Sequence, residues 1–196
     1  VPVAFENATG DLAAGDYTVT VRTADDELTG HLTVQTPAEA DLADLQIAGQ
    51  GDSATIVHGD NESVAVNVTN LGEEVSTFDV TLTVDGHTET VTTSELGLDQ
   101  SETVAFEDVT GELAAGEYEI DVSTADGASV TGSLTVQTPA ASELSNLDIA
   151  GQGADAEIDE GDNESVTVGV ENVGEADGTF DVTLTREGGE LSVTES

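Results

Sequence analysis

A long internal repeat is the feature that most constrains this chain. Residues 42–83 align with residues 144–185 at a constant offset of 102, and 27 of these 42 positions are identical. Residues 1–21 align in the same way with residues 102–122, at an offset of 101. Because self-similarity at a fixed period is typical of repeated structural units, we expect each copy to form the same supersecondary arrangement.

The repeat also sets the expected domain boundaries. Residues 1–38 correspond to the C-terminal half of a repeat, residues 39–140 to a complete repeat, and residues 141–196 to the N-terminal half of a third. The two partial repeats are complementary, because Val1 aligns with Glu102 and Ser196 with Ser94. Two interpretations stay open. Either the chain is a stretch of a longer tandem array, or each chain completes a domain with the next chain.

Alternation of apolar and polar residues predicts that each repeat is built from β-strands. In the complete repeat, Val64, Val66 and Val68 share one face of such a segment. The expected strands are short and lie about 8–12 residues apart, which is the pattern of a β-sandwich. They are expected near residues 44–48, 54–57, 63–69, 76–84, 88–93, 102–107, 116–123 and 128–136. The predicted fold is therefore all-β, with tandem immunoglobulin-like Greek-key β-sandwiches.

A tyrosine motif supports the Greek-key prediction. The sequence LAAGEY, which ends at Tyr118, has the L-x-x-G-x-Y form of a tyrosine corner, and the same form ends at Tyr17. In such a corner the tyrosine hydroxyl bonds to nearby backbone and fixes the crossover between two sheets. Tyr17 and Tyr118 are thus predicted to be structural residues.

Two longer stretches resemble a known family. GDNESVAVNVTNLGEEVSTFDVTLTVDG and SETVAFEDVTGELAAGEYEIDVSTA are similar to CARDB-type (cell adhesion related) domains, on the spacing of Asn70, Gly72, Phe78 and Val80 and on the tyrosine corner that follows. The resemblance covers the central repeat and both flanking halves. It implies immunoglobulin-like sandwiches in tandem on prokaryotic surface proteins, with roles in spacing, adhesion or assembly and no conserved catalytic residues. The acidity resembles that of haloarchaeal surface proteins.

The charge of the chain admits two explanations. There are 42 Asp and Glu residues against 2 Lys and Arg residues, which gives a formal net charge of −40. High charge with 3% aromatic residues is typical of disordered chains. The regular alternation favours the other explanation, a folded protein adapted to molar salt, where the Debye length falls to about 3 Å and repulsion between carboxylates is screened.

The composition also excludes several kinds of partner and chemistry. A nucleic-acid partner is excluded because binding phosphates needs a basic face. Direct membrane insertion of this segment is not expected, because no apolar run reaches the roughly 18–20 residues of a spanning helix. The absence of Cys excludes disulfides, thiolate metal sites and a cysteine nucleophile. No catalytic motif stands out, so we expect a protein that is not an enzyme and requires no cofactor.

A repeated acidic turn carries candidate ligands for calcium. Asp60 and Glu62 lie in a GDNES turn that recurs with Asp162 and Glu164. Carboxylates on a turn are the ligands that Ca²⁺ takes, so these four residues are candidate calcium ligands. The alternative is a solvated acidic turn before a strand.

Four N-x-[ST] sequons are candidate glycosylation sites. Their asparagines are Asn7, Asn61, Asn67 and Asn163. In a surface protein such asparagines accept glycans at exposed positions, although a chain rich in Thr and Ser also produces the triplet by chance.

These features together predict a non-enzymatic extracellular structural protein. We expect a tandem-repeat fibre, filament or stalk on the cell surface of a halophile, in which the repeats associate with each other or with neighbouring chains. Completion of half-domains between subunits is one way to build it, because open sheet edges and apolar faces are usually covered. Two alternatives stay open. The chain is an adhesin binding module, or it is an accessory domain of a larger secreted enzyme.

Overall fold

The computed structural model describes residues 2–186 and 189–195, and no helix occurs among them. The described chain consists of strands joined by turns, which confirms the predicted all-β class. The strands are β1 (Gly15–Arg22), β2 (Glu27–Val34), β3 (Ala40–Ile47), β4 (Ser53–Val57), β5 (Val64–Asn70), β6 (Asp79–Val84), β7 (His87–Thr92), β8 (Ser101–Phe106), β9 (Gly116–Thr124), β10 (Ser129–Gln137), β11 (Ser142–Ile149), β12 (Val166–Asn172), β13 (Phe180–Arg186) and β14 (Gly189–Glu195).

The central part of the chain forms a two-layer sandwich. Strands β3, β5 and β8 make a three-stranded sheet in that order, and the second sheet has the order β4-β10-β9-β6-β7. Strand β4 pairs parallel with β10, whereas the other pairs within these two sheets are antiparallel. The chain passes from one sheet to the other after β3, β4, β5, β7 and β8, whereas the neighbours β6 and β7, and β9 and β10, stay in the same sheet. This is an immunoglobulin-like arrangement.

The core lies between the two sheets of the central sandwich. The inward positions of β5 are all buried, and its outward positions are half-buried, so the alternation in the sequence is the alternation of the two faces. The facing layer contributes Val80 and Leu82 from β6, with Ile120 and Val122 from β9. These side chains belong to one contiguous cluster of buried residues.

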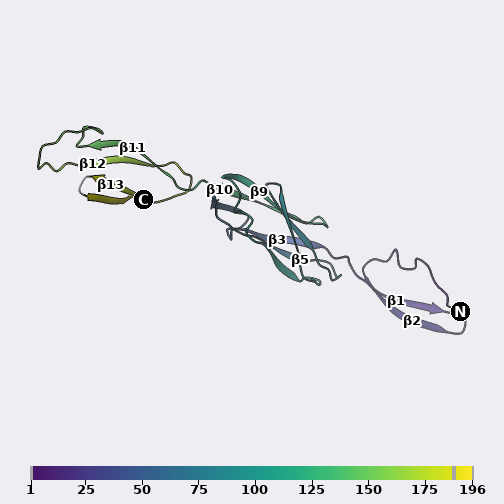
Figure 1. Ribbon diagram of the computed structural model, residues 1–196. Helices are drawn as coiled ribbons and strands as arrows, with labels where there is room; N and C mark the ends of the chain where they lie inside the picture. Colours follow the sequence, from purple (N-terminus) through teal and green to yellow (C-terminus); the bar gives the residue numbers. More distant parts are fainter. Residues whose placement is uncertain (1, 187–188, 196) are drawn as a thin grey trace.

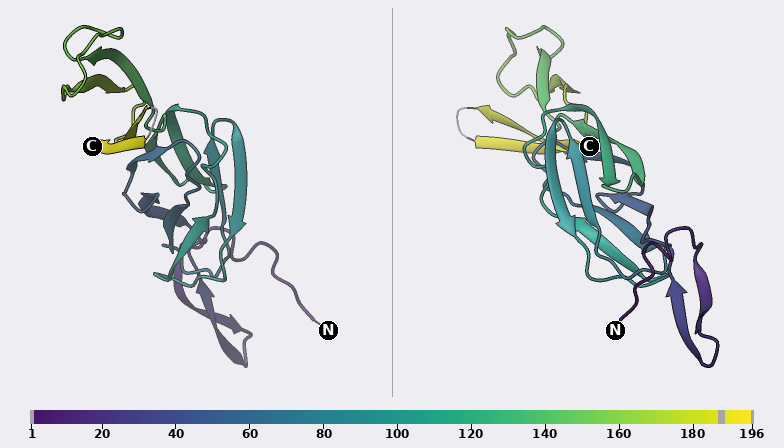
Figure 2. Two further views of the ribbon diagram at one scale, coloured as in Figure 1. Left: turned by 60° about the vertical axis from the view of Figure 1, so that its left-hand side comes forward. Right: turned by 90° about the vertical axis from the view of Figure 1, so that its right-hand side faces the viewer.

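The flanking parts keep the strand pairing of the central repeat without completing its sandwich. In β1–β2, Tyr17 lies opposite Leu32, as Tyr118 lies opposite Leu134 in β9–β10. The β11–β12 pair has the same register irregularity as β3–β5, between Ser145 and Asp148. Figure 1 shows β1–β2, the central sandwich and β11–β13 following one another along the molecule, and Figure 2 shows β1–β2 and β11–β12 at opposite ends of the sandwich. Tandem complete sandwiches stay a prediction.

Two expected strand starts in the central repeat were wrong by a few residues. Strand β3 begins at Ala40 rather than at residue 44, because Asp44 takes a positive φ of 53° inside a bulge and interrupts the alternation. Strand β6 begins at Asp79 rather than at residue 76. The Phe78 amide donates a hydrogen bond to the Thr93 hydroxyl at 2.9 Å, and this side-chain contact interrupts the ladder between the two segments. Ser76, which precedes the interruption, makes only an isolated bridge to Leu96.

Candidate functional site

The candidate functional site is the pair of open apolar faces in the two partial repeats. The repeat supplies an internal control, since the same residue types are covered at equivalent positions of the central sandwich. Phe106 is fully buried and its equivalent Phe5 is 68% exposed. Leu45 is 4% exposed and its equivalent Leu147 is 46% exposed. Several residue types that the complete repeat buries in its core are therefore exposed in the partial repeats, and others there are half-buried.

The C-terminal partial repeat carries a groove where the central sandwich has its core. Its volume is about 850 Å³. The lining includes apolar residues of β11, β12 and β13 whose equivalents in the central repeat are core or packed against it. These lining residues are Leu144, Leu147, Val166, Val168, Val182 and Leu184. Among the described residues, the groove is thus the uncovered inner face formed by β11, β12 and β13.

Two segments of the partial repeats form no strand, although their equivalents in the central repeat do. Residues 155–159 are equivalent to β4 but do not form a strand, and residues 2–5 are equivalent to the end of β8 and also stay irregular. In the central repeat β4 bonds to β10, and β8 bonds to β5. A strand needs a hydrogen-bonded neighbour, so both segments lack the partner that orders their equivalents.

Both tyrosine corners have their hydrogen bond. The Tyr17 hydroxyl donates to the Ala13 carbonyl at 2.8 Å, and the Tyr118 hydroxyl donates to the Ala114 carbonyl at 2.9 Å. Each bond joins a tyrosine inside β1 or β9 to a carbonyl just before that strand and fixes the entry to the strand. The local corner therefore forms in the partial repeat as well as in the complete one.

A buried asparagine holds the end of β5, and its role was not predicted. The Asn70 side-chain oxygen accepts from the backbone amides of Glu39 at 3.2 Å and Gly72 at 2.9 Å. Its amide nitrogen donates to the carbonyls of Glu74 and Leu96, each at 2.8 Å. All its polar atoms are used, which explains why a fully buried amide is tolerated here. The sequence signal was the Asn-x-Gly triplet, which recurs at residues 172–174.

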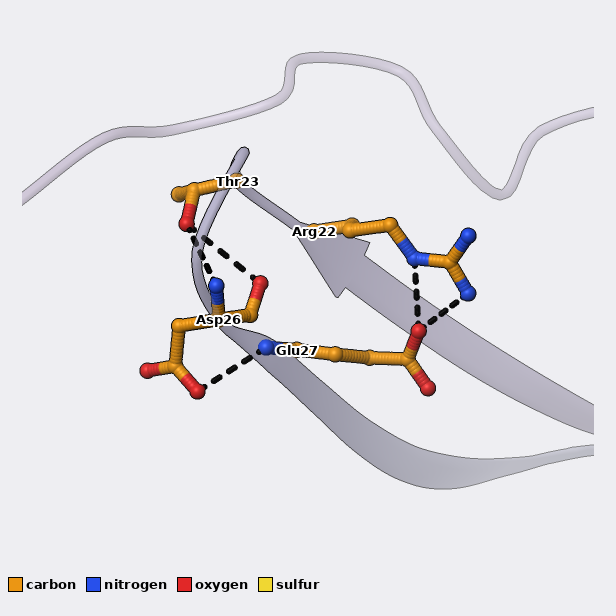
Figure 3. Close-up of polar contacts among 4 residues, drawn as sticks. All are labelled: Arg22, Thr23, Asp26 and Glu27. Carbon is orange, nitrogen blue, oxygen red and sulfur yellow. Dashed lines mark hydrogen bonds and ion pairs between the residues drawn. The ribbon is translucent and has the colours of Figure 1, made fainter.

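One of the two arginines serves the turn of the first hairpin. The Arg22 Nε donates to the Glu27 carboxylate at 2.6 Å, and these residues are opposite each other at the turn end of β1 and β2 (Figure 3). The Thr23 hydroxyl accepts from the Asp26 amide at 3.1 Å, while the Asp26 carboxylate accepts from the Glu27 amide at 2.9 Å. This exposed cation is thus committed to a local ion pair.

Hydrogen bonds to nearby hydroxyl and amide groups lower the pKa of two carboxylates, Glu102 and Asp126. Hydrogen bonds from the Ser94 hydroxyl and amide lower the pKa of Glu102. Burial acts to raise the pKa of Asp126, but hydrogen bonds from the Thr124 hydroxyl and the Ala40 amide outweigh it and lower the pKa. The Asp126–Ala40 bond, at 2.6 Å, ties the β9–β10 turn to the start of β3.

The candidate calcium ligands lie in exposed or half-buried turn positions. The Asp60 carboxylate accepts from the Val57 amide at 3.0 Å, and the Asp162 carboxylate accepts from the Asp159 amide at 3.2 Å. Glu62 and Glu164 flank these turns. Across residues 2–186, no group of three or more His, Asp or Glu side chains is gathered to hold a metal ion. Calcium binding stays a sequence prediction without a coordinating cluster.

The four sequon asparagines occupy different environments. Asn7, Asn61 and Asn163 are exposed outside the strands, whereas Asn67 is half-buried on the outward face of β5. The Asn61 side-chain oxygen accepts from the Gly111 amide at 3.2 Å. Glycosylation stays a prediction at all four.

Comparison with known proteins places the central repeat in a class. Its fold defines an immunoglobulin-like β-sandwich, and residues 42–137 match the CARDB family model. The central repeat therefore has the sequence pattern of a CARDB domain. A search of curated proteins found no match.

Several solved structures are similar to part of the chain. The CARDB domain of a Pyrococcus furiosus protein in complex with di-metal ions is 15% identical, with a TM-score of 0.42, and the match covers 54% of this chain and 97% of that one. A β-glucosidase from Listeria innocua in complex with glucose is 16% identical, with a TM-score of 0.37, over 50% of this chain and 16% of that one.

In the described part, no helix is long and apolar enough to cross a membrane.

Proposed function

We propose that this chain is a non-enzymatic structural module of an extracellular fibre, filament or stalk on the surface of a halophile. Its open halves are completed by strands of a second copy. One observation carries the proposal, namely that residues buried in the complete repeat are exposed or only half-buried at equivalent positions of the partial repeats. Three core residues of the central sandwich are Phe106, Ile120 and Val122. Their equivalents in the first partial repeat are exposed, namely Phe5, Val19 and Val21.

The central sandwich indicates how the two halves would combine. Strand β6 pairs with β9, and Leu82 lies opposite Val122. Leu184 is equivalent to Leu82 and Val21 to Val122, so Leu184 of one copy would lie opposite Val21 of the next. In the same way β5 pairs with β8, with Val64 opposite Phe106, so Val166 would lie opposite Phe5. Strand addition of this kind covers sheet edges and apolar faces together.

The charge of the chain supports a salt-rich external setting. A net charge of −40 on 196 residues creates strong self-repulsion in dilute buffer, and molar salt screens it.

Electron microscopy of the purified chain in molar salt tests the proposed function. We expect regular fibres whose axial spacing corresponds to one or two repeats. Dispersed single particles at every protein concentration would contradict assembly and favour a binding module.

A further inference from the structure

The connection between consecutive repeats contains almost no free chain. Strand β10 ends at Gln137, whose carbonyl accepts a hydrogen bond from the His58 amide of the central sandwich at 2.8 Å. The next residue, Thr138, already bonds to the loop after β12 in the following repeat. A chain that is held by one repeat at residue 137 and by the next at residue 138 has no flexible linker between them.

Thr138 is held in that loop by three kinds of hydrogen bond. Its amide donates to the Glu175 carboxylate at 2.8 Å, and its hydroxyl accepts from the Glu175 amide at 3.0 Å. Its carbonyl accepts from the Ala176 amide at 3.0 Å. The amide, hydroxyl and carbonyl of one threonine are thus all recognised by two successive residues of the loop.

The first connection repeats the same contacts. The Thr36 amide donates to the Glu73 carboxylate at 3.0 Å, and the Thr36 hydroxyl accepts from the Glu73 amide at 2.9 Å. The Thr36 carbonyl accepts from the Glu74 amide at 3.1 Å. Both connections have the sequence Gln-Thr-Pro-Ala, and both loops contain Gly-Glu. The same contact therefore occurs twice in one chain, at positions 102 residues apart.

A glycine makes room for this contact in each loop. A Cβ atom on Gly72 would lie 2.0 Å from the Pro37 carbonyl oxygen, and a Cβ atom on Gly174 would lie 2.0 Å from the Pro139 carbonyl oxygen. Neither carbonyl oxygen can rotate away as a side chain would, because each is part of the backbone. Any side chain at Gly72 or Gly174 would push the connecting segment out of the loop.

We propose that residues 72–74 and 174–176 form a socket that binds the Thr-Pro segment at the end of the preceding repeat. The socket fixes the orientation of consecutive repeats. Its ligand is an extended dipeptide with a free amide, hydroxyl and carbonyl on its threonine. Proline favours this extended form in the residue before it, so little conformational entropy is lost on docking. The resulting array is a rod whose joints are set by one local contact.

Pulsed electron spin resonance on the full chain tests the socket. The chain has no cysteine, so spin labels attach only at Thr18→Cys and Glu89→Cys, and dilution with an excess of unlabelled chain leaves the distance from β1 to β7 within one chain, across the first joint. We expect a narrow distance distribution in molar salt. Gly72→Ala should release the segment, and four free residues would spread the separation by about 10 Å or more.

Gly10→Ala is the matched control. A Cβ atom on Gly10 meets no heavy atom within 4 Å, so this change should leave the distribution narrow. Thr36→Val removes the hydroxyl without adding bulk to the loop and should broaden the distribution less than Gly72→Ala. Circular dichroism of each variant checks that the sandwich is folded. A broad distribution in the unchanged chain, or an unchanged distribution in folded Gly72→Ala, would overturn the proposal, and neither result depends on whether fibres form.

Discussion

The matched phenylalanines give the sharpest mutational test of the open halves. Phe106 is fully buried opposite Val64, so Phe106→Ala should lower the free energy of unfolding of the central sandwich by about 3–5 kcal/mol. Phe5 has only about a third of its surface covered. An aromatic side chain buries about 150–250 Å² when enclosed, so the covered part of Phe5 corresponds to about 1–2 kcal/mol at most.

Urea denaturation in molar salt, followed by circular dichroism, measures both changes. In dilute single chains we expect Phe5→Ala to change the free energy of unfolding by no more than about 2 kcal/mol. When the chains assemble, Phe5 would enter the groove of a neighbour, and Phe5→Ala should then weaken association. Equal destabilisation by both substitutions in single chains would refute the claim that the partial repeats are open.

Two further predictions concern the corner and the charge. Tyr118→Phe removes the hydrogen bond to Ala114 and should destabilise the central sandwich by about 1 kcal/mol, measured as a shift of the urea midpoint at constant slope. An unaltered midpoint would show that the corner contributes nothing to stability. Transfer from molar salt to dilute buffer without divalent cations should loosen or unfold the repeats, because repulsion among 42 carboxylates is no longer screened. A sheet signal that stays constant on this transfer would argue against adaptation to salt.

The sequence predicted the central fold well because its strands are amphipathic. The inward face of β5 is Val64, Val66 and Val68, and a period of two fixes both the strand and the side that is buried. The starts of β3 and β6 were less accurate. A bulge at Asp44 and an isolated bridge at Ser76 depend on neighbouring strands, which local alternation does not describe.

The state of the partial repeats was harder to anticipate. Residues 155–159 are equivalent to strand β4 but form no strand, because strand formation there depends on a partner far away in sequence. The socket was missed for a related reason. The repeated Gln-Thr-Pro and Gly-Glu sequences were visible, but nothing in the sequence shows that Thr36 contacts Glu73 across 37 positions.

Cysteine cross-linking tests the central claim most directly. Ala65 lies opposite Ala105 in the central sandwich, and the repeat makes Thr167 and Ala4 their equivalents. In molar salt, oxidation of a chain carrying Ala4→Cys and Thr167→Cys should give a ladder of disulfide-linked multimers. The matched pair Ala65→Cys and Ala105→Cys should give cross-linked monomer only. Monomer alone from the first pair, under conditions where the second pair cross-links fully, would contradict completion of the half-repeats by a second copy.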